Sequence, residues 1–199
     1  MSPAVSEIYF ASTNKNKIKE INALLPDTFV VKGIENLIQG ELEETGNTLE
    51  ENALMKAKAV FQLTGRPAFA DDTGLEVRSL NNAPGVYSAR YAGPQRCDKD
   101  NIDKLLNEMG ALADRNARFR TVIAFVDGEQ SKLFEGIVNG TIATQLAGTN
   151  GFGYDPVFIP EETGLTFAQM TLEEKNQISH RARAFRAFAE FMKSYNANS

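Results

Sequence analysis

Two apolar segments on either side of Asp127-Gly128 constrain the fold more than any other feature of this chain. Residues 119–126 and 132–138 are rich in β-branched and aromatic side chains. An Asp-Gly pair between two such segments is a strong β-hairpin signal, and a hairpin forces its strands to pair antiparallel. The remaining segments alternate between expected strands and helices. We therefore predict an α/β fold with a mixed sheet and flanking helices.

Apolar periodicity and capping residues place these elements. Thr48-Leu49-Glu50-Glu51 and Thr171-Leu172-Glu173-Glu174 are capping boxes, and Ser179 is a further candidate cap. Helices are expected over residues 15–25, 48–64 and 99–109 and from residue 179 onward. Strands are expected at residues 7–11, 29–31, 68–70, 75–77, 141–143 and 157–159, besides the hairpin.

Length and composition favour one domain over residues 1–199, with room for two lobes around one core; 42% of the residues are hydrophobic. The formal net charge of -5 argues against a nucleic-acid partner, because such domains usually carry a basic excess. No apolar segment approaches the ~18 residues of a membrane span, and no leader pattern opens the chain. We expect a cytoplasmic protein with no membrane partner. One cysteine and one histidine also make a zinc site improbable.

An apolar run ends in two adjacent carboxylates at Phe69-Ala70-Asp71-Asp72-Thr73-Gly74. Because neighbouring side chains on a strand point to opposite faces, Asp71 and Asp72 cannot share one environment. A carboxylate directed into a cleft serves metal binding or general-base chemistry. A solvated turn between two strands is the alternative, since Asp and Gly are common in turns. On this segment alone both interpretations stay open.

Two expected helices begin with positive charges, although the N-terminus of a helix is already partly positive. Lysines follow the turn Ser12-Thr13-Asn14, and His180, Arg181 and Arg183 follow Ser179. Backbone N–H groups and ammonium groups at a helix start together form an anion site. Solvated side chains on an exposed face are the alternative, because the dipole penalty is only about 0.3–1 kcal/mol per charge.

A second acidic cluster, Glu41-Leu42-Glu43-Glu44, lies shortly before the helix that Thr48 caps. Together with Asp72 it offers the one or two carboxylates that bind Mg²⁺ alongside waters and substrate phosphates. On the helix itself Asn52 and Lys56 are four residues apart and share one polar stripe. That stripe faces either a cleft or the solvent.

Seven short motifs, spread over nearly the whole chain, carry a family resemblance. They are Ser12-Thr13-Asn14-Lys15-Asn16-Lys17, Glu43-Glu44-Thr45-Gly46, Glu51-Asn52-Ala53 with Lys56, Ala70-Asp71-Asp72-Thr73-Gly74-Leu75, Pro84-Gly85-Val86-Tyr87-Ser88-Ala89-Arg90-Tyr91, Gly151-Phe152-Gly153-Tyr154-Asp155-Pro156 and Ser179-His180-Arg181. In this order they resemble the inosine triphosphate pyrophosphatase family, whose members hydrolyse ITP, dITP and XTP to the monophosphate and pyrophosphate. The family commonly has Thr-Gly-Asn where this chain has Ser12-Thr13-Asn14, so the turn loses the backbone freedom of glycine.

The resemblance implies a long twisted mixed sheet and two lobes around a central active-site cleft. It implies that Asp72 orients or deprotonates the attacking water and that Lys56 neutralises phosphate charge. Mg²⁺ is the implied cofactor, with Asp72 and either Glu43 or Glu44 as ligands, and we prefer Glu44. The implied substrate contacts in this part of the chain are Ser12, Thr13, Asn14, Lys15, Asn16, Lys17 and Thr73.

The C-terminal part is the implied base pocket. Hypoxanthine and xanthine present a 6-keto acceptor where adenine presents an amino donor. A pocket lined with donors therefore accepts the first two bases and discriminates against adenine. The resemblance implies that Phe152 stacks on the base and that Gly153, Tyr154 and Asp155 belong to the loop that holds this ring. The implied hydrogen-bond donors are Lys175, His180 and Arg181.

We therefore predict a Mg²⁺-dependent nucleoside triphosphate pyrophosphatase for deaminated purines. Family members are commonly homodimers, and residues 81–93 are a candidate interface by analogy. A related enzyme for pyrimidine or methylated nucleotides is the nearest alternative, and Phe152 and the Ser179-His180-Arg181 motif argue against it. A haloacid-dehalogenase-type phosphatase needs Asp-x-Asp, whereas this chain has Asp71-Asp72. A nucleotide-binding module without catalysis is disfavoured, because the acidic and basic residues are all present.

Overall fold

The computed structural model describes residues 6–13, 18, 21, 25, 27–38, 40 and 42–195. The predicted phosphate-binding residues Asn14, Lys15, Asn16 and Lys17 lie outside the described residues, as does most of the helix expected over 15–25. The roles predicted for these four residues stay predictions.

Two compact units divide the chain. Unit 1 comprises Met1–Asp72, Val122–Glu135 and Ala184–Ser199, and unit 2 comprises Thr73–Thr121 and Gly136–Arg183. Strands β3 (Ala68–Val77), β5 (Asn116–Val126) and β6 (Ser131–Ile142) contribute residues to both. Neighbouring strands pair in the order β2-β1-β3-β5-β6-β7, and β4 pairs with β3. The mixed α/β sheet is confirmed, whereas the cleft implied by the resemblance stays a prediction.

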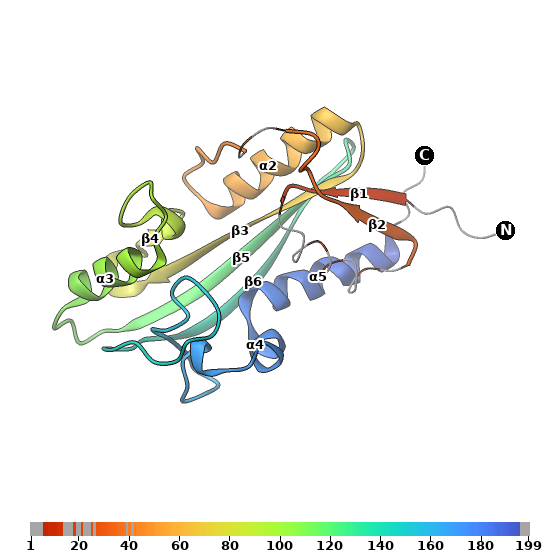
Figure 1. Cartoon of the computed structure of the whole chain (residues 1–199). Helices are drawn as coiled ribbons and strands as arrows, with labels where there is room; N and C mark the ends of the chain where they lie inside the picture. Colours follow the sequence, from red (N-terminus) through yellow and green to blue (C-terminus); the bar gives the residue numbers. More distant parts are fainter. Residues whose placement is uncertain are drawn as a thin grey trace. The chain divides into compact units, whose positions relative to one another are not determined.

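In unit 1, parallel pairing brings β1 (Ser6–Phe10) against β2 (Phe29–Lys32) and against β3. Helices α2 (Leu49–Thr64) and α5 (His180–Ser194) lie against opposite sides of these strands (Figure 1). The rings on the α5 side form the main core, in which Phe10 and Phe69 stack with centroids 4.7 Å apart. The predicted inward face of the last helix is confirmed, because its members are buried in this core: Phe185, Phe188, Ala189 and Met192.

Helix α2 begins where its capping residue predicts. The Thr48 hydroxyl accepts a hydrogen bond from Glu51 N at 3.1 Å. The Glu51 carboxylate accepts from Asn47 N instead of Thr48 N, so only half of the expected capping box forms. The helix ends at Gly65, whose φ of 62° suits a residue without a Cβ. The fixed start and end of α2 determine which of its side chains face the interior.

Unit 2 holds β4 (Pro84–Gly85), α3 (Asp98–Met109), β7 (Phe158–Pro160) and α4 (Leu172–Ile178) around a second apolar core. Three short 3₁₀ helices, Arg78–Leu80, Ser88–Arg90 and Phe167–Gln169, belong to it as well. The capping box at Thr171 is confirmed, with both of its hydrogen bonds to Glu174 present. Ser179 also caps α5, since its hydroxyl accepts from Ala182 N at 3.2 Å.

The turn left open as an alternative for Asp71-Asp72-Thr73-Gly74 is excluded, because β3 runs without a break over Ala68–Val77 and joins the strands expected at 68–70 and 75–77. One expectation about strands is wrong. The separate strand expected at 141–143 is instead the end of β6, whose Ile142 pairs with Phe158 of β7. In both places pairing with neighbouring strands outweighs the low strand propensity of Asp and Gly. The predicted hairpin is confirmed, with β5 and β6 neighbours on either side of the Asp127 turn.

Candidate active site

Lys56 lies at the centre of a group of charged residues in unit 1. Its Nζ atom donates to Glu44 Oε1 at 2.6 Å and to the backbone oxygen of Asp71 at 2.8 Å. Asp72 Oδ1 lies 3.9 Å from the same nitrogen. We call Glu44, Lys56, Asp71 and Asp72 the carboxylate–lysine cluster. It joins three segments: the loop before α2, α2 itself and β3.

The local structure explains why these groups meet. Asn52 and Lys56 lie one turn apart on α2 and are 0% and 9% exposed, so the polar stripe faces the interior and not the solvent. Alternation along β3 separates the side chains of Asp71 and Asp72, as expected. Lys56 therefore contacts the backbone of one and approaches the carboxylate of the other.

The electrostatics of the cluster keep Lys56 charged. Burial by itself would lower the pKa of its ammonium group. The negative charges of Asp72, Asp71 and Glu44, together with the hydrogen bond to Glu44, outweigh burial and raise the pKa above its usual value. A positive charge thus persists between two carboxylates at neutral pH.

Residues of the cluster fit a hard cation. Glu44 and Asp72 both lie around one ammonium group, which shows that this place accommodates positive charge. Glu43 is exposed and Glu44 is half-buried, and the choice of metal ligand between them stays a prediction. Among the described residues, no three His, Cys, Asp or Glu side chains gather closely enough to hold a metal by themselves. A pair of carboxylates completed by waters and substrate phosphates is the arrangement typical of Mg²⁺.

Two residues of the predicted phosphate loop are described. Ser12 is half-buried, and its backbone oxygen accepts from Ile34 N at 3.2 Å. Thr13 is exposed. They are two and three residues beyond the end of β1 at Phe10, so the sheet fixes the chain close to the start of the predicted loop.

A second group of site residues lies in unit 2, around the exposed ring of Phe152. This ring is 62% exposed. Lys175 Nζ lies 5.0 Å and Arg181 Cζ 5.7 Å from its centroid, which are cation–π distances. We call Phe152, Lys175 and Arg181 the aromatic–cation cluster. It offers a flat apolar surface flanked by hydrogen-bond donors.

Asp155 and Asp98 hold the loop that carries Phe152. Asp155 Oδ2 accepts from Phe152 N at 2.9 Å and from Lys175 Nζ at 2.5 Å. Gly153 N donates to Asp98 Oδ2 at 2.7 Å, and Gly153 has a φ of +58°. The sequence pattern did not single out Asp98, because an acidic residue in the first turn of a helix is ordinary and its partner lies 55 residues away.

The other residues predicted for this pocket are more enclosed. Tyr154 is 4% exposed and its hydroxyl donates to Ser88 O at 2.9 Å, so it shapes the loop from within the core. The His180 ring is 6% exposed and stacks on Phe119 with centroids 4.5 Å apart. Thr73 shares a hydroxyl–hydroxyl hydrogen bond of 2.8 Å with Thr121. Direct contact of these three residues with a substrate stays a prediction.

Arg183 is engaged by residues of unit 2. Its guanidinium donates to the backbone oxygen of Ile137 at 2.9 Å and pairs with Glu162. One of the three basic residues at the start of α5 therefore stabilises unit 2. The other two, His180 and Arg181, lie beside aromatic rings.

Comparison with known proteins decides the family. The model of the Ham1 family matches residues 8–191, which include both clusters. The chain belongs to the Ham1 family.

Two relatives are proteins named dITP/XTP pyrophosphatase. The one from Flavobacterium psychrophilum is 50% identical over 189 residues, covering 94% of this chain and all of that protein. The one from Staphylococcus aureus is 45% identical over 190 residues, covering 94% and 97%. The resemblance seen in the motifs is confirmed.

Solved structures of Ham1 proteins have the same fold. The Staphylococcus aureus Ham1 protein matches with a TM-score of 0.91 at 44% identity, covering 95% of this chain and 99% of that one. A HAM1 protein from Coxiella burnetii matches with a TM-score of 0.92 at 38% identity, covering 96% and 100%. The arrangement of strands and helices is therefore that of the Ham1 family.

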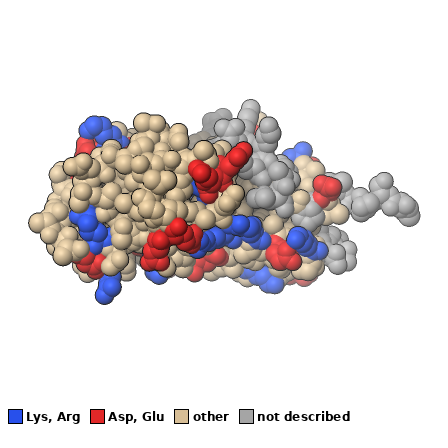
Figure 2. Space-filling model, turned by 90° about the horizontal axis from the view of Figure 1, so that it is seen from below, with Lys and Arg blue, Asp and Glu red and all other residues tan. Residues whose placement is uncertain are grey.

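Acidic and basic side chains of the described residues are interspersed on the face seen in Figure 2. The expected absence of a nucleic-acid partner stays a prediction. Within the described part of the chain, no helix combines the length and the apolar character that a membrane span requires.

Proposed function

We propose that this protein hydrolyses deaminated purine nucleoside triphosphates, namely dITP, ITP and XTP, to the monophosphate and pyrophosphate. The observation that carries the proposal is 50% identity, over 94% of the chain, to a protein named dITP/XTP pyrophosphatase. The two clusters supply what such a reaction needs, which is charge control at the phosphates and recognition of the base.

The carboxylate–lysine cluster serves the phosphates. Lys56 offers its ammonium group to phosphate oxygens, and Asp72 orients the attacking water and accepts its proton. Glu44 and Asp72 would hold Mg²⁺, with Glu43 as the less favoured ligand. The metal would supply neutralisation of the charge that develops at the phosphates when water attacks the α-phosphorus and pyrophosphate leaves. No covalent nucleophile is needed, since positioning and charge neutralisation drive phosphoryl transfer.

The aromatic–cation cluster serves the base. Phe152 stacks on the purine, and the ammonium of Lys175 and the guanidinium of Arg181 donate to its 6-keto oxygen. Adenine presents an amino donor at that position, so donor would face donor and ATP is rejected. Asp155 holds Lys175 in place, which keeps the donor directed at the ring.

The remaining properties follow from the same proposal. The protein acts in the cytoplasm on the nucleotide pool, without a nucleic-acid or membrane partner. It forms a homodimer, as expected from the resemblance. The triphosphate is held by residues 12–17, which continue from the end of β1.

Asp72→Asn tests the proposal. We expect pyrophosphate release from dITP to fall about 100-fold or more, because a general base is lost, while the melting temperature stays within a few degrees. Asp103→Asn, a change on the outer face of α3, is the matched control and leaves the rate unchanged. Unchanged turnover in Asp72→Asn would remove Asp72 from the mechanism. Binding of dITP without any turnover in the wild type would favour a nucleotide-binding module instead.

A further inference from the structure

The loop before α2 carries Glu44, and it has no regular secondary structure over residues 42–48. Glu44 nevertheless reaches Lys56, which lies 12 residues further along the chain. Side chains from the start of α2 hold the loop in place. Asn52 Oδ1 accepts from Gly46 N at 2.8 Å, and Glu51 Oε2 accepts from Asn47 N at 2.6 Å.

These two contacts differ in burial. Glu51 is exposed, so water competes with its hydrogen bond. Asn52 is 0% exposed, and its hydrogen bond with Gly46 N is partly buried, so water competes less with it. Because a backbone N–H can only donate, this contact also fixes the orientation of the Asn52 amide, with Oδ1 toward the loop.

Gly46 fits closely against Asn52. A Cβ at position 46 would lie 2.7 Å from Asn52 Oδ1 and 2.7 Å from Glu51 Cβ, closer than real Cβ contacts. The loop therefore rests directly on the helix, and only a residue without a side chain allows it. Glu44 is two residues from this contact, whereas Lys56 is one helical turn beyond Asn52 on the same face.

We propose that Asn52 is a positioning residue that sets the Mg²⁺ affinity of the site by fixing the loop that carries Glu44, so that this carboxylate stays beside Asp72. This inference rests on the proposed function, in which Glu44 and Asp72 hold the metal. In this role Asn52 acts on the metal through the loop that carries Glu44 and not as a ligand. Partners that orient metal ligands in this way typically account for about 10–100-fold in metal affinity.

Asn52→Ala is the direct test. We expect the Mg²⁺ concentration for half-maximal pyrophosphate release to rise about 10-fold or more, with little change in the KM for dITP at saturating Mg²⁺. The melting-temperature increase caused by Mg²⁺ without nucleotide should need correspondingly more metal. Asn52→Asp keeps the acceptor for Gly46 N and adds negative charge, so its half-saturating Mg²⁺ should not exceed about threefold that of the wild type.

Asn101→Ala is the matched control. Asn101 is also a buried helix residue, 2% exposed, and its Oδ1 accepts from a loop amide, Ala92 N, at 2.7 Å. Its loss should lower the melting temperature much as Asn52→Ala does, but leave the half-saturating Mg²⁺ unchanged. Gly46→Ala displaces the same contact from the loop side and should reproduce the Mg²⁺ shift, so the test does not depend on one variant.

The outcomes separate two failures. If the wild type depends on Mg²⁺ but Asn52→Ala and Gly46→Ala keep its half-saturating concentration, the positioning role of Asn52 is refuted and the proposed function stands. An equal shift in Asn101→Ala would likewise refute it, since the effect would then be general loosening. If pyrophosphate release by the wild type does not depend on Mg²⁺ at all, the metal role of Glu44 fails, and this inference fails with it.

Discussion

Replacing Lys56 by methionine removes the one positive charge of the carboxylate–lysine cluster while keeping most of the side-chain volume. Lys56 makes two hydrogen bonds, one to the Glu44 carboxylate and one to the backbone oxygen of Asp71. A hydrogen bond to a charged group contributes roughly 1.5–3 kcal/mol, and breaking a fully buried ion pair costs about 3–5 kcal/mol.

The side chains of Lys56 and Glu44 are 11% and 26% exposed, so water reaches part of the pair. We therefore expect Lys56→Met to lower the free energy of unfolding by about 2–3 kcal/mol, below the range for full burial. The carboxylates of Glu44 and Asp72 would then repel each other without a counter-charge, and an added divalent cation should replace the ammonium group. At ten times its dissociation constant, Mg²⁺ would restore about 1.4 kcal/mol.

Urea unfolding followed by circular dichroism, with and without Mg²⁺, measures both effects. Lys58→Met, an exposed change on the same helix, is the control and should alter the free energy of unfolding by no more than about 0.5 kcal/mol. Mg²⁺ should stabilise Lys56→Met more than the wild type, because it need not displace an ammonium group. Equal stabilisation of both, or a loss no larger than that of Lys58→Met, would refute this reasoning.

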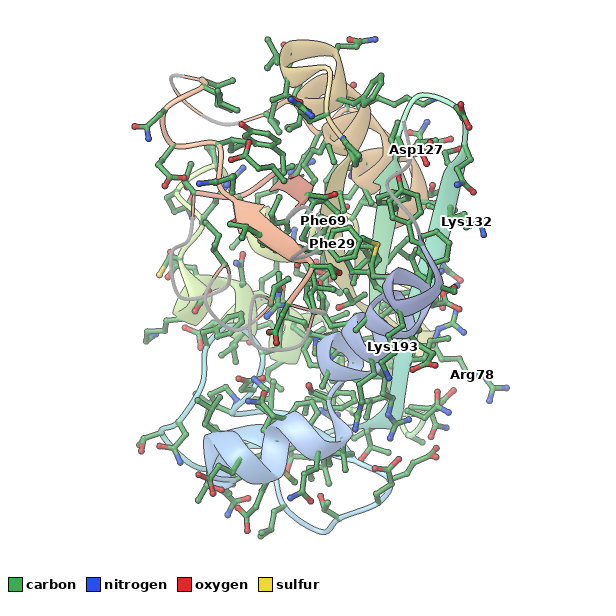
Figure 3. All side chains as sticks on the ribbon, turned by 90° about the vertical axis from the view of Figure 1, so that its right-hand side faces the viewer. Phe29, Phe69, Arg78, Asp127, Lys132 and Lys193 are labelled. Carbon is green, nitrogen blue, oxygen red and sulfur yellow. The ribbon has the colours of Figure 1, made fainter. Side chains whose placement is uncertain are left out.

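Two further predictions concern other parts of the chain. Asp98→Ala removes the acceptor of Gly153 N and loosens the Phe152 loop. The KM for dITP should therefore rise about 3–10-fold, while the melting temperature changes little. An unchanged KM in steady-state kinetics would contradict this. Asp127 lies in the β5–β6 turn (Figure 3). Burial alone would raise the pKa of its carboxyl group. Hydrogen bonds from Gln130 outweigh burial and hold this pKa below its usual value. The wild type should therefore have a larger free energy of unfolding than Asp127→Asn at pH 7. This difference should shrink as the pH falls below about 4, through the lowered pKa. Urea unfolding measures it, and a difference that grows toward low pH would contradict the assignment.

Local sequence patterns predicted the elements whose causes are local. The hairpin at Asp127 and the caps at Thr48 and Thr171 depend on residues a few positions apart, and all three are found. The apolar periodicity of the last helix likewise predicted its buried face. Phe29 and Phe69, which lie in the same core (Figure 3), come from expected strands with apolar runs.

Contacts between distant residues lay beyond such patterns. The continuity of β3 through Asp71-Asp72 depends on pairing with strands far along the chain, against the local preference of Asp for turns. The contact between Glu44 and Lys56 likewise required the packing of α2 on β3, whereas the preference for Glu44 over Glu43 as a metal ligand came from the resemblance and stays a prediction. Gly153 and Asp98 meet across 55 residues, and nothing near either residue indicates the other.

Hydrolysis of dITP against dATP, with and without Mg²⁺ and with the released product identified, tests the central claim most directly. The account predicts Mg²⁺-dependent release of pyrophosphate and dIMP from dITP, while dATP is nearly untouched. Release of orthophosphate would contradict the proposed position of cleavage. Equal rates with dATP would contradict the assignment of the aromatic–cation cluster to the base.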